Sequence, residues 1–386
     1  MRIVIISREG SADRRYGLGR AVGRIADGLR QRGHEVWYCT TADWGERERR
    51  QCQWLKRRLP LPEVLRAPFA ERLVQGWHVT RFALRHRATH VWLQDPWLVP
   101  GMQWRLRCSG HWRAPFRWGV SEHGLGSFAW AVQQDGITLA QRDYRRLLRN
   151  ERRWLRRADW VWSPSRTAHE ALLRDLALPQ APAGWSAPGY GAPELDGTAL
   201  RRAAEKPVER RDRAARPPLV LCVGRMAPVK AQDRVVEALL ILQQEHGLDT
   251  RLWIVGEGRI EDLPPGAGLL AHAPRIEPVE EIEQALGQAD LYVSACAVES
   301  FGLANREAVA AGLPCVVASG GANDEVLDGG AWLVPSDPAS LADALRVLLT
   351  DEVAAAFWRR QSRRAAAGWR GWETVIDDHE RLLNDA

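Results

Sequence analysis

Short runs of apolar, β-branched residues alternate with helical patterns along this chain, and the alternation occurs twice. In the first half we predict strands at Arg2–Ser7, His34–Thr40, Thr89–Gln94, Phe116–Ser121 and Trp160–Ser163, with helices at 17–32, 140–157 and 166–176. In the second half we predict strands at Pro218–Val223, Arg251–Val255, Gly268–His272, Leu291–Ser294, Pro314–Ala318 and Ala331–Val334, with helices at 231–246, 279–289, 303–312 and from 338 onward. Such alternation is typical of parallel sheets with helices on both faces. The sequence therefore predicts an α/β fold with two tandem, doubly wound domains.

The two alternating regions are separated by a stretch that has no periodic pattern. Residues 177–216 are rich in proline, glycine, alanine and arginine, which is typical of a connection between domains. A length of 386 residues also suits two domains. We therefore expect an N-terminal domain at 1–190, a linker at 191–216, a second domain at 217–365 and a final helix at 366–386.

The two halves carry opposite charge. The net charge of +6 divides into +18 for residues 1–216 and −12 for residues 217–386. The chain strongly prefers arginine and has lysine only at 56, 206 and 230. This preference explains which basic residue is used, but not why the two halves have net charges of opposite sign. The first half is therefore expected to meet something anionic, such as a membrane face, a phosphorylated substrate or nucleic acid.

Several classes of protein are excluded by composition. No segment has 18 consecutive uncharged apolar residues, and the N-terminal run MRIVIISREG turns polar too early for a signal peptide. The six cysteines are scattered, without a C-x-x-C pair, so they favour neither a disulfide framework nor a zinc site. We expect a cytoplasmic protein with reduced thiols.

A turn at the start of the second half has the residues needed to bind an anion. After the strand at 218–223 come Gly224 and Arg225, and Lys230 follows just before the helix. The glycine permits a sharp turn, and the two cations can converge on one phosphate group. Lys230 is the stronger signal, because arginine is abundant here and lysine is rare.

A second turn, at 299–307, combines a helix N-terminus with two glutamates. Free backbone amides at a helix N-terminus favour a phosphate or a sugar hydroxyl. Glu299 lies in the turn, while Glu307 lies on a helix whose following residues are almost all apolar. A buried carboxylate there needs hydroxyl donors, and a ribose diol supplies two. A third glycine-containing turn, Gly320–Val326, follows the next strand.

These motifs resemble those of the retaining glycosyltransferases of family 4, which have the GT-B fold. The resemblance covers about residues 217–345 and includes VGRMAPVKAQD, the E-x7-E pattern of ESFGLANRE, and GGANDEVLDGGAWLVP. A weaker likeness at 16–36, YGLGRAVGRIADGLRQRGHEV, matches the glycine-rich loop and first helix of that family. The resemblance implies two Rossmann-like domains, an acceptor site on the first, a donor site on the second, and reaction in the cleft between them.

The resemblance also assigns roles to individual residues. Catalytic roles would fall to His123, Glu299, Arg225 and Lys230, with the two cations holding the donor diphosphate and Glu299 beside the transferred sugar. Glu307 would bind the ribose hydroxyls. The remaining donor contacts would come from Gly17, Gly19, Gly224, Phe301, Gly302 and Leu303. One departure from the family is Ala187–Tyr190, where many relatives have an Asn-Gly turn.

No D-x-D motif occurs in the sequence, so no acidic pair of that kind is available to hold a divalent cation on the diphosphate. We therefore expect no metal cofactor, with protein cations and helix N-termini stabilising the leaving group. The resemblance implies retention of configuration by same-face attack, without a protein nucleophile. The donor would be a nucleotide-sugar, most simply a UDP-sugar.

The first half contains a basic helix and a second basic segment that are candidates for contact with the acceptor. On a helical wheel of residues 141–157, arginines occupy one side and Tyr144, Leu147, Leu148, Trp154 and Leu155 the other, with Glu151 intruding on the apolar side. A core-facing helix with a solvated basic face explains this pattern, and so does contact with an anionic lipid or glycolipid. Gln53–Arg58 adds a tryptophan and three basic residues. We expect a saccharide or lipid-linked acceptor in bacterial cell-surface glycan synthesis of the lipopolysaccharide kind, at the inner face of the plasma membrane.

Two other functions remain open from the sequence. A nucleotide-sugar epimerase would use the same donor motifs. A nucleic-acid-binding protein would explain the basic first half, with tryptophans as stacking platforms, but not the acidic second half.

Overall fold

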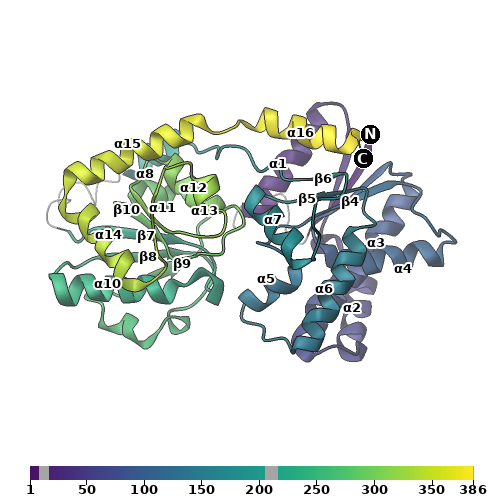
Figure 1. Cartoon of the computed structure of the whole chain (residues 1–386), viewed down its shortest axis with the longest axis horizontal. Helices are drawn as coiled ribbons and strands as arrows, with labels where there is room; N and C mark the ends of the chain where they lie inside the picture. The colour runs from purple at the N-terminus through teal and green to yellow at the C-terminus, as the bar shows by residue number, and fades with distance from the viewer. Residues whose placement is uncertain (8–16, 205–215, 386) are drawn as a thin grey trace. The chain divides into compact units, whose positions relative to one another are not determined.

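A computed structural model describes residues 1–7, 17–204 and 216–385 of the chain, and it has two compact units. The first unit comprises Met1–Gln133, Ile137–Tyr190 and Trp372–Ala386. The second comprises Gln134–Gly136 and Gly191–Gly371. Each contains one six-stranded sheet in which every strand pair is parallel (Figure 1). The predicted fold class is confirmed.

The sheet of the first unit has the strand order β2-β1-β3-β4-β5-β6. Its strands are β1 (Arg2–Ile6), β2 (Glu35–Cys39), β3 (His90–Leu93), β4 (Arg117–Ser121), β5 (Trp160–Trp162) and β6 (Trp185–Ser186). Its helices are α1 (Gly17–Gln31), α2 (Glu46–Arg58), α3 (Glu63–Arg85), α4 (Val99–Cys108), α5 (Phe128–Gln134), α6 (Gln141–Leu155), α7 (Arg166–Asp175) and α16 (Trp372–Asp385). Residues 3–6 of β1 are fully buried on both faces, as expected for a strand covered by helices on both sides.

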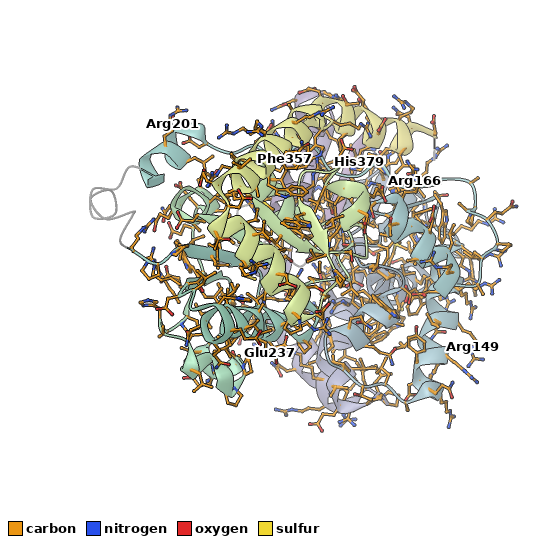
Figure 2. All side chains as sticks on the ribbon, turned by 60° about the vertical axis from the view of Figure 1, so that its left-hand side comes forward. Arg149, Arg166, Arg201, Glu237, Phe357 and His379 are labelled. Atoms are coloured by element: carbon orange, nitrogen blue, oxygen red, sulfur yellow. The ribbon has the colours of Figure 1, made fainter. Side chains whose placement is uncertain are left out.

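The last helix of the chain, α16, packs against α1 of the same unit, and Figure 1 shows the two side by side. Gly28 on α1 permits this approach, because a Cβ there would lie 2.1 Å from Ile376 Cδ1. His379, labelled in Figure 2, is fully buried on α16, with its ring edge-on to those of Trp92 and Trp162. The end of the chain is therefore part of the first unit's core.

The sheet of the second unit has the order β12-β11-β10-β7-β8-β9. Its strands are β7 (Leu219–Val223), β8 (Arg251–Val255), β9 (Arg275–Glu277), β10 (Leu291–Ser294), β11 (Cys315–Ala318) and β12 (Trp332–Val334). Its helices are α8 (Gly197–Ala204), α10 (Gln232–His246), α11 (Ile282–Gln288), α12 (Leu303–Ala310), α13 (Asn323–Val326), α14 (Pro338–Thr350) and α15 (Glu352–Gly368). Side chains of β7, β8, β10, α10 and α14 form one continuous buried core.

Two predictions about individual elements are wrong, and one strand was not predicted. The strand expected at Gly268–His272 is instead a 3-10 helix at Pro265–Leu269, because Ala267 and Leu270, three residues apart, turn together into the core. The strand that was not predicted is β9, at the edge of the second unit's sheet. It is short and polar, so a search for apolar runs does not find it. The stretch at 177–216 was expected to lack regular structure but includes β6 and α8, and Thr198 N donates to Asp196 Oδ1 (2.7 Å) at the start of α8.

The expected start of the final helix at residue 366 is also wrong, because residue 366 lies inside α15. The helix ends at Gly368, and α16 begins only at Trp372. The alanine-rich sequence before the break carries no proline, so the glycines at 368 and 371 are its only markers. All six cysteines are free, and no described helix is long and apolar enough to cross a bilayer.

Candidate functional site

The polar turns singled out in the second half follow strands β7, β10 and β11, which lie side by side in the sheet. Because these strands are parallel, their carboxyl ends meet at one edge, where open α/β sheets bind ligands. Gly224–Lys230 follows β7, Glu299–Gly302 lies between β10 and α12, and Gly320–Ala322 lies between β11 and α13. We call these three turns, with the first part of α12, the donor edge.

Lys230 and Glu299 form an ion pair at the centre of the donor edge. Both side chains are largely buried, with 27% and 15% of their surfaces exposed. Burial alone would lower the pKa of Lys230, but the Glu299 carboxylate outweighs that effect and raises it. Lys230 is therefore a buried ammonium group with an opposite charge in contact. The sequence identified both residues but not their contact.

Arg225 and Gly224 occupy the same turn as Lys230. The Arg225 side chain is about half exposed. Gly224 has φ +151°, and a Cβ on Gly256 would lie 2.2 Å from the Gly224 carbonyl oxygen, so the turns after β7 and β8 approach closely. Gln232 Nε2 donates to the Arg225 carbonyl oxygen at 3.0 Å and so stabilises the turn from α10. Gln232 is 2% exposed and belongs to the motif VGRMAPVKAQD, but the sequence alone assigned it no role.

The glycines at 320 and 321 bring two backbones of the donor edge together. A Cβ on Gly321 would lie 2.5 Å from the Glu299 carbonyl oxygen, and one on Gly320 would lie 2.8 Å from the Ala297 carbonyl oxygen. Both glycines have positive φ, +114° for Gly320 and +56° for Gly321. Ala322 N donates to the Glu299 carbonyl oxygen at 2.8 Å. These glycines therefore fix the backbone that carries Glu299.

A buried chain of hydrogen bonds lies behind the donor edge. The Tyr292 hydroxyl donates to Asn305 Oδ1 (2.8 Å), and Asn305 Nδ2 donates to Asn323 Oδ1 (3.0 Å). Asn323 Nδ2 in turn donates to the carbonyl oxygens of Cys296 (3.0 Å), two residues beyond β10, and of Ala318 (2.8 Å), the last residue of β11. This asparagine network joins α12, α13 and both strand ends. The sequence does not reveal this network, because its members lie on separate elements and meet only in the folded sheet.

The first turns of α12 carry the rest of the predicted donor residues. Phe301 is buried, Gly302 caps the helix with φ +63°, and Leu303 is its first residue. Glu307 is 8% exposed, as the apolar sequence around it predicted. Beside it, the Arg306 guanidinium lies over the rings of Phe301 and Trp369, 4.8 and 4.1 Å from their centroids. Burial lowers the pKa of Arg306 to about 10.

His123 of the first unit follows β4 and has both ring nitrogens hydrogen-bonded. Nε2 lies 2.8 Å from Gln94 Oε1, and Nδ1 lies 2.8 Å from the Tyr190 hydroxyl. Because an amide oxygen only accepts, Nε2 carries the proton and Nδ1 accepts from the tyrosine. Burial lowers the pKa of His123 to about 3, so the ring is neutral at neutral pH. A substrate contact by His123 would replace one of these two bonds.

The glycines expected to approach the donor, Gly17 and Gly19, lie in the first turn of α1, and Gly19 is buried. Of the predicted glycine-rich loop and first helix at 16–36, Tyr16 lies outside the described residues. The first unit also explains Glu151, which the helical wheel of α6 left unexplained. Its carboxyl oxygens accept from the amides of Phe128 (2.8 Å) and Ala129 (3.3 Å) at the start of α5.

Two family models match the chain, one on each half. "Glycosyltransferase Family 4" matches residues 16–183, and "Glycosyl transferases group 1" matches residues 217–351. The second match includes all the donor-edge residues described above.

Curated proteins are similar over part of their length. A GDP-mannose-dependent alpha-(1-6)-phosphatidylinositol monomannoside mannosyltransferase of Mycolicibacterium smegmatis is 32% identical over 177 residues, 42% of this chain and 44% of that protein. A D-inositol 3-phosphate glycosyltransferase of Geodermatophilus obscurus is 35% identical over 178 residues, 41% of this chain and 38% of that protein. The match therefore spans less than half the length of either relative.

Among solved structures, sucrose-phosphate synthase from Thermosynechococcus elongatus has the same fold. It aligns with a TM-score of 0.73 and 19% identity, covering 100% of this chain and 98% of that one.

Proposed function

We propose, since the chain belongs to the group 1 and family 4 glycosyltransferases, that it transfers a sugar from a nucleoside diphosphate to a saccharide or glycolipid acceptor. The observation that carries the proposal is the Lys230–Glu299 ion pair at the donor edge. One partner has the charge that a diphosphate needs, and the other can accept hydrogen bonds from sugar hydroxyls. A nucleotide-sugar therefore offers a matching group to each of them.

In this proposal the pair keeps both charges neutralised until a donor binds. The donor phosphates then take over Lys230, together with Arg225 from the same turn, and the sugar hydroxyls take over Glu299. Because Lys230 stays protonated, it is ready to receive negative charge as the sugar–phosphate bond breaks. Fixed cations of this kind stabilise a leaving group without reorganising during the reaction.

Glu307 and the α12 N-terminus complete the proposed donor site. Glu307 binds the ribose hydroxyls, while the amides of Phe301, Gly302 and Leu303 donate to the sugar and phosphate oxygens. The asparagine network holds these groups in place from behind, since it fixes both α12 and the strand end before Glu299. A positional error of about 1 Å would lower the rate substantially.

The proposed reaction retains the configuration of the sugar. The acceptor hydroxyl attacks the anomeric carbon from the face that the diphosphate leaves. A new bond forms between the acceptor oxygen and this carbon, the bond to the phosphate oxygen breaks, and the acceptor proton passes to the departing phosphate. No protein nucleophile takes part. A neutral His123 contributes a hydrogen bond to the sugar in this scheme, not a proton.

The acceptor is proposed to be a saccharide or a lipid-linked saccharide of a bacterial cell-surface glycan, of the lipopolysaccharide kind. The arginines of α6 support this proposal, because most of them are exposed on one face, including Arg149, which is labelled in Figure 2. A basic helix face can bind anionic lipid headgroups at the inner face of the plasma membrane. Flotation with phosphatidylglycerol vesicles at low salt tests this, and absence of binding contradicts the membrane part.

Product analysis by mass spectrometry tests the reaction. UDP- and GDP-sugars are incubated with and without mixed saccharide acceptors. We expect transfer to an acceptor with release of a nucleoside diphosphate, and we propose UDP as the carrier, while the Mycolicibacterium relative is named for GDP-mannose. Conversion of the donor sugar into its epimer without an acceptor would contradict the proposal.

A further inference from the structure

A wide groove on the first unit lies at the amino-terminal edge of its sheet, opposite to the edge that carries His123. It has a volume of about 1490 Å³. It is lined by the first residues of β1, β3 and β4, by Asp159 just before β5, and by the C-terminal parts of α3 and α4. None of its lining residues belongs to the predicted catalytic or donor set.

Six arginines line this groove: Arg2, Arg87, Arg107, Arg113, Arg117 and Arg157. Within the described residues, none of their guanidinium groups has a hydrogen bond or an ion pair. Arg32 of the same unit shows the alternative, since it contacts Glu373, Asp377 and Glu380 within 3.3 Å. We call the six residues the arginine groove.

The helix ends and the one acid at the groove do not balance this charge. The C-termini of α3, α4 and α6 contribute about half a negative charge each. Asp159 is the one carboxylate in the lining, and its Oδ2 already accepts from Trp118 N at 2.7 Å. Six positive charges therefore face about two and a half negative ones. An external anion would remove the remaining repulsion.

Two further features of the groove indicate more than a phosphate ion. The indole of Trp112 is 92% exposed, which is unusual for so large an apolar side chain, and it offers a flat face for a ring. His111 Nδ1 is buried and has no hydrogen-bond partner in the described structure. One guanidinium group can donate two parallel hydrogen bonds to the oxygens of one phosphate. The volume also exceeds the roughly 300–1,000 Å³ of a typical small-molecule pocket.

From the excess of positive charge, the exposed indole and the volume, we infer that the arginine groove binds a phosphate-bearing oligosaccharide. The arginines would bind its phosphates, and Trp112 would stack on a sugar ring. Single-stranded nucleic acid fits less well, because its binding uses successive aromatic platforms and the other indole of the groove, Trp118, is only 8% exposed. The site is separate from sugar transfer. Through this site the enzyme would hold the phosphate-bearing part of a glycan, while the end of the glycan that accepts the sugar stays free to react elsewhere.

Calorimetry with glucose 1,6-bisphosphate and with inorganic tripolyphosphate tests the inference at physiological salt. The full chain carries Lys230→Ala in every sample, so that the donor edge contributes little phosphate binding. We expect Arg113→Gln/Arg117→Gln to weaken both probes about tenfold or more. Trp112→Ala should weaken the sugar bisphosphate severalfold and leave tripolyphosphate unchanged. Maltotriose, which has no phosphate, should not bind.

The matched control is Arg360→Gln/Arg364→Gln, which removes the same charge from exposed positions of α15 and should change neither affinity more than twofold. Equal effects of the two double variants, or no binding of either probe, would overturn the inference. So would a dT12 oligonucleotide or phosphatidylglycerol vesicles that bind through the groove more tightly than the sugar bisphosphate. Failure of sugar transfer itself leaves these binding results unaffected, so the two proposals can fail separately.

Discussion

The carboxyl edges of the two sheets bury acidic side chains in different ways. In the second unit, Glu299 is paired with Lys230. In the first unit, Asp95 is likewise paired with Arg72, but Glu122 and Glu151 are fully buried with no ion pair among the described residues. Burial raises the pKa of both glutamates, that of Glu151 to about 8. Paired burial keeps charge ready for a ligand, whereas unpaired burial favours the protonated acid. The comparison suggests that the second unit holds a paired charge for a ligand, whereas the first unit, beside its own buried ion pair, also holds carboxyl groups in the protonated form.

Removing Lys230, the partner of Glu299, should have the largest effect on the rate of sugar transfer. Lys230→Ala should lower the rate of sugar transfer about 10²–10³-fold, because the departing diphosphate loses its buried counter-charge. Initial rates at saturating donor provide the measurement. Arg360→Ala removes one exposed positive charge from α15, is the matched control and should stay near the wild-type rate. Near-normal turnover of Lys230→Ala would remove the distinction between the two edges.

Breaking the asparagine network behind Glu299 should have a smaller effect, which is seen in the stability of the fold. Asn323→Ala leaves the carbonyl oxygens of Cys296 and Ala318 and the amide of Asn305 without their partner. We expect a loss of about 2–3 kcal/mol in the free energy of unfolding, measured by urea denaturation. Asn150→Ala on α6 serves as the control and should change stability by less than about 0.5 kcal/mol. Equal losses for the two variants would mean that the network is not a specific support.

The unpaired acids make the first unit sensitive to pH. Because the folded-state pKa of Glu151 lies above its unfolded value, the protonated acid stabilises the fold fully below the unfolded pKa of about 4.5. That contribution is lost as the pH rises towards 8, and the free energy of unfolding should fall by at most about 1.4 kcal/mol per pH unit. Urea midpoints across this range should fall for the wild type and fall less for Glu151→Gln, and equal slopes would contradict this origin.

His123 should contribute the smallest pH effect of the groups discussed. With its pKa lowered to about 3, it stays neutral at every pH where the protein is ordinarily assayed. The pH profile of kcat/KM between pH 5 and 8 should therefore contain no step that His123→Gln abolishes. A step near pH 6.5 that disappears in this variant would show that the histidine titrates during catalysis.

Much of the fold follows from local patterns in the sequence. Strands such as β1 and β11 are short apolar runs buried on both faces, and the helix predicted at 17–32 is α1, which is followed by a glycine with positive φ at residue 33. The edge strand β9 could not be identified this way, because its polar residues resemble a loop. The break between α15 and α16 was not predicted, because only two glycines mark it in the sequence.

The donor-edge residues were identified by type and spacing, but their contacts were not. Lys230 and Glu299 are 69 positions apart, and their pairing depends on which strands are neighbours in the sheet. The capping of α5 by Glu151 likewise joins two helices, so a wheel of α6 alone could not explain it. Such long-range partners come only from the assembled structure.

The most direct test of the account is a calorimetric titration with UDP and GDP in excess EDTA, using the wild type, Lys230→Ala and Lys56→Ala. We predict that at least one nucleotide binds the wild type equally well with EDTA and with Mg²⁺. The same nucleotide should bind Lys230→Ala about tenfold or more weakly and Lys56→Ala normally. Binding that requires Mg²⁺, or that is indifferent to Lys230, would contradict the claim that protein cations receive the diphosphate.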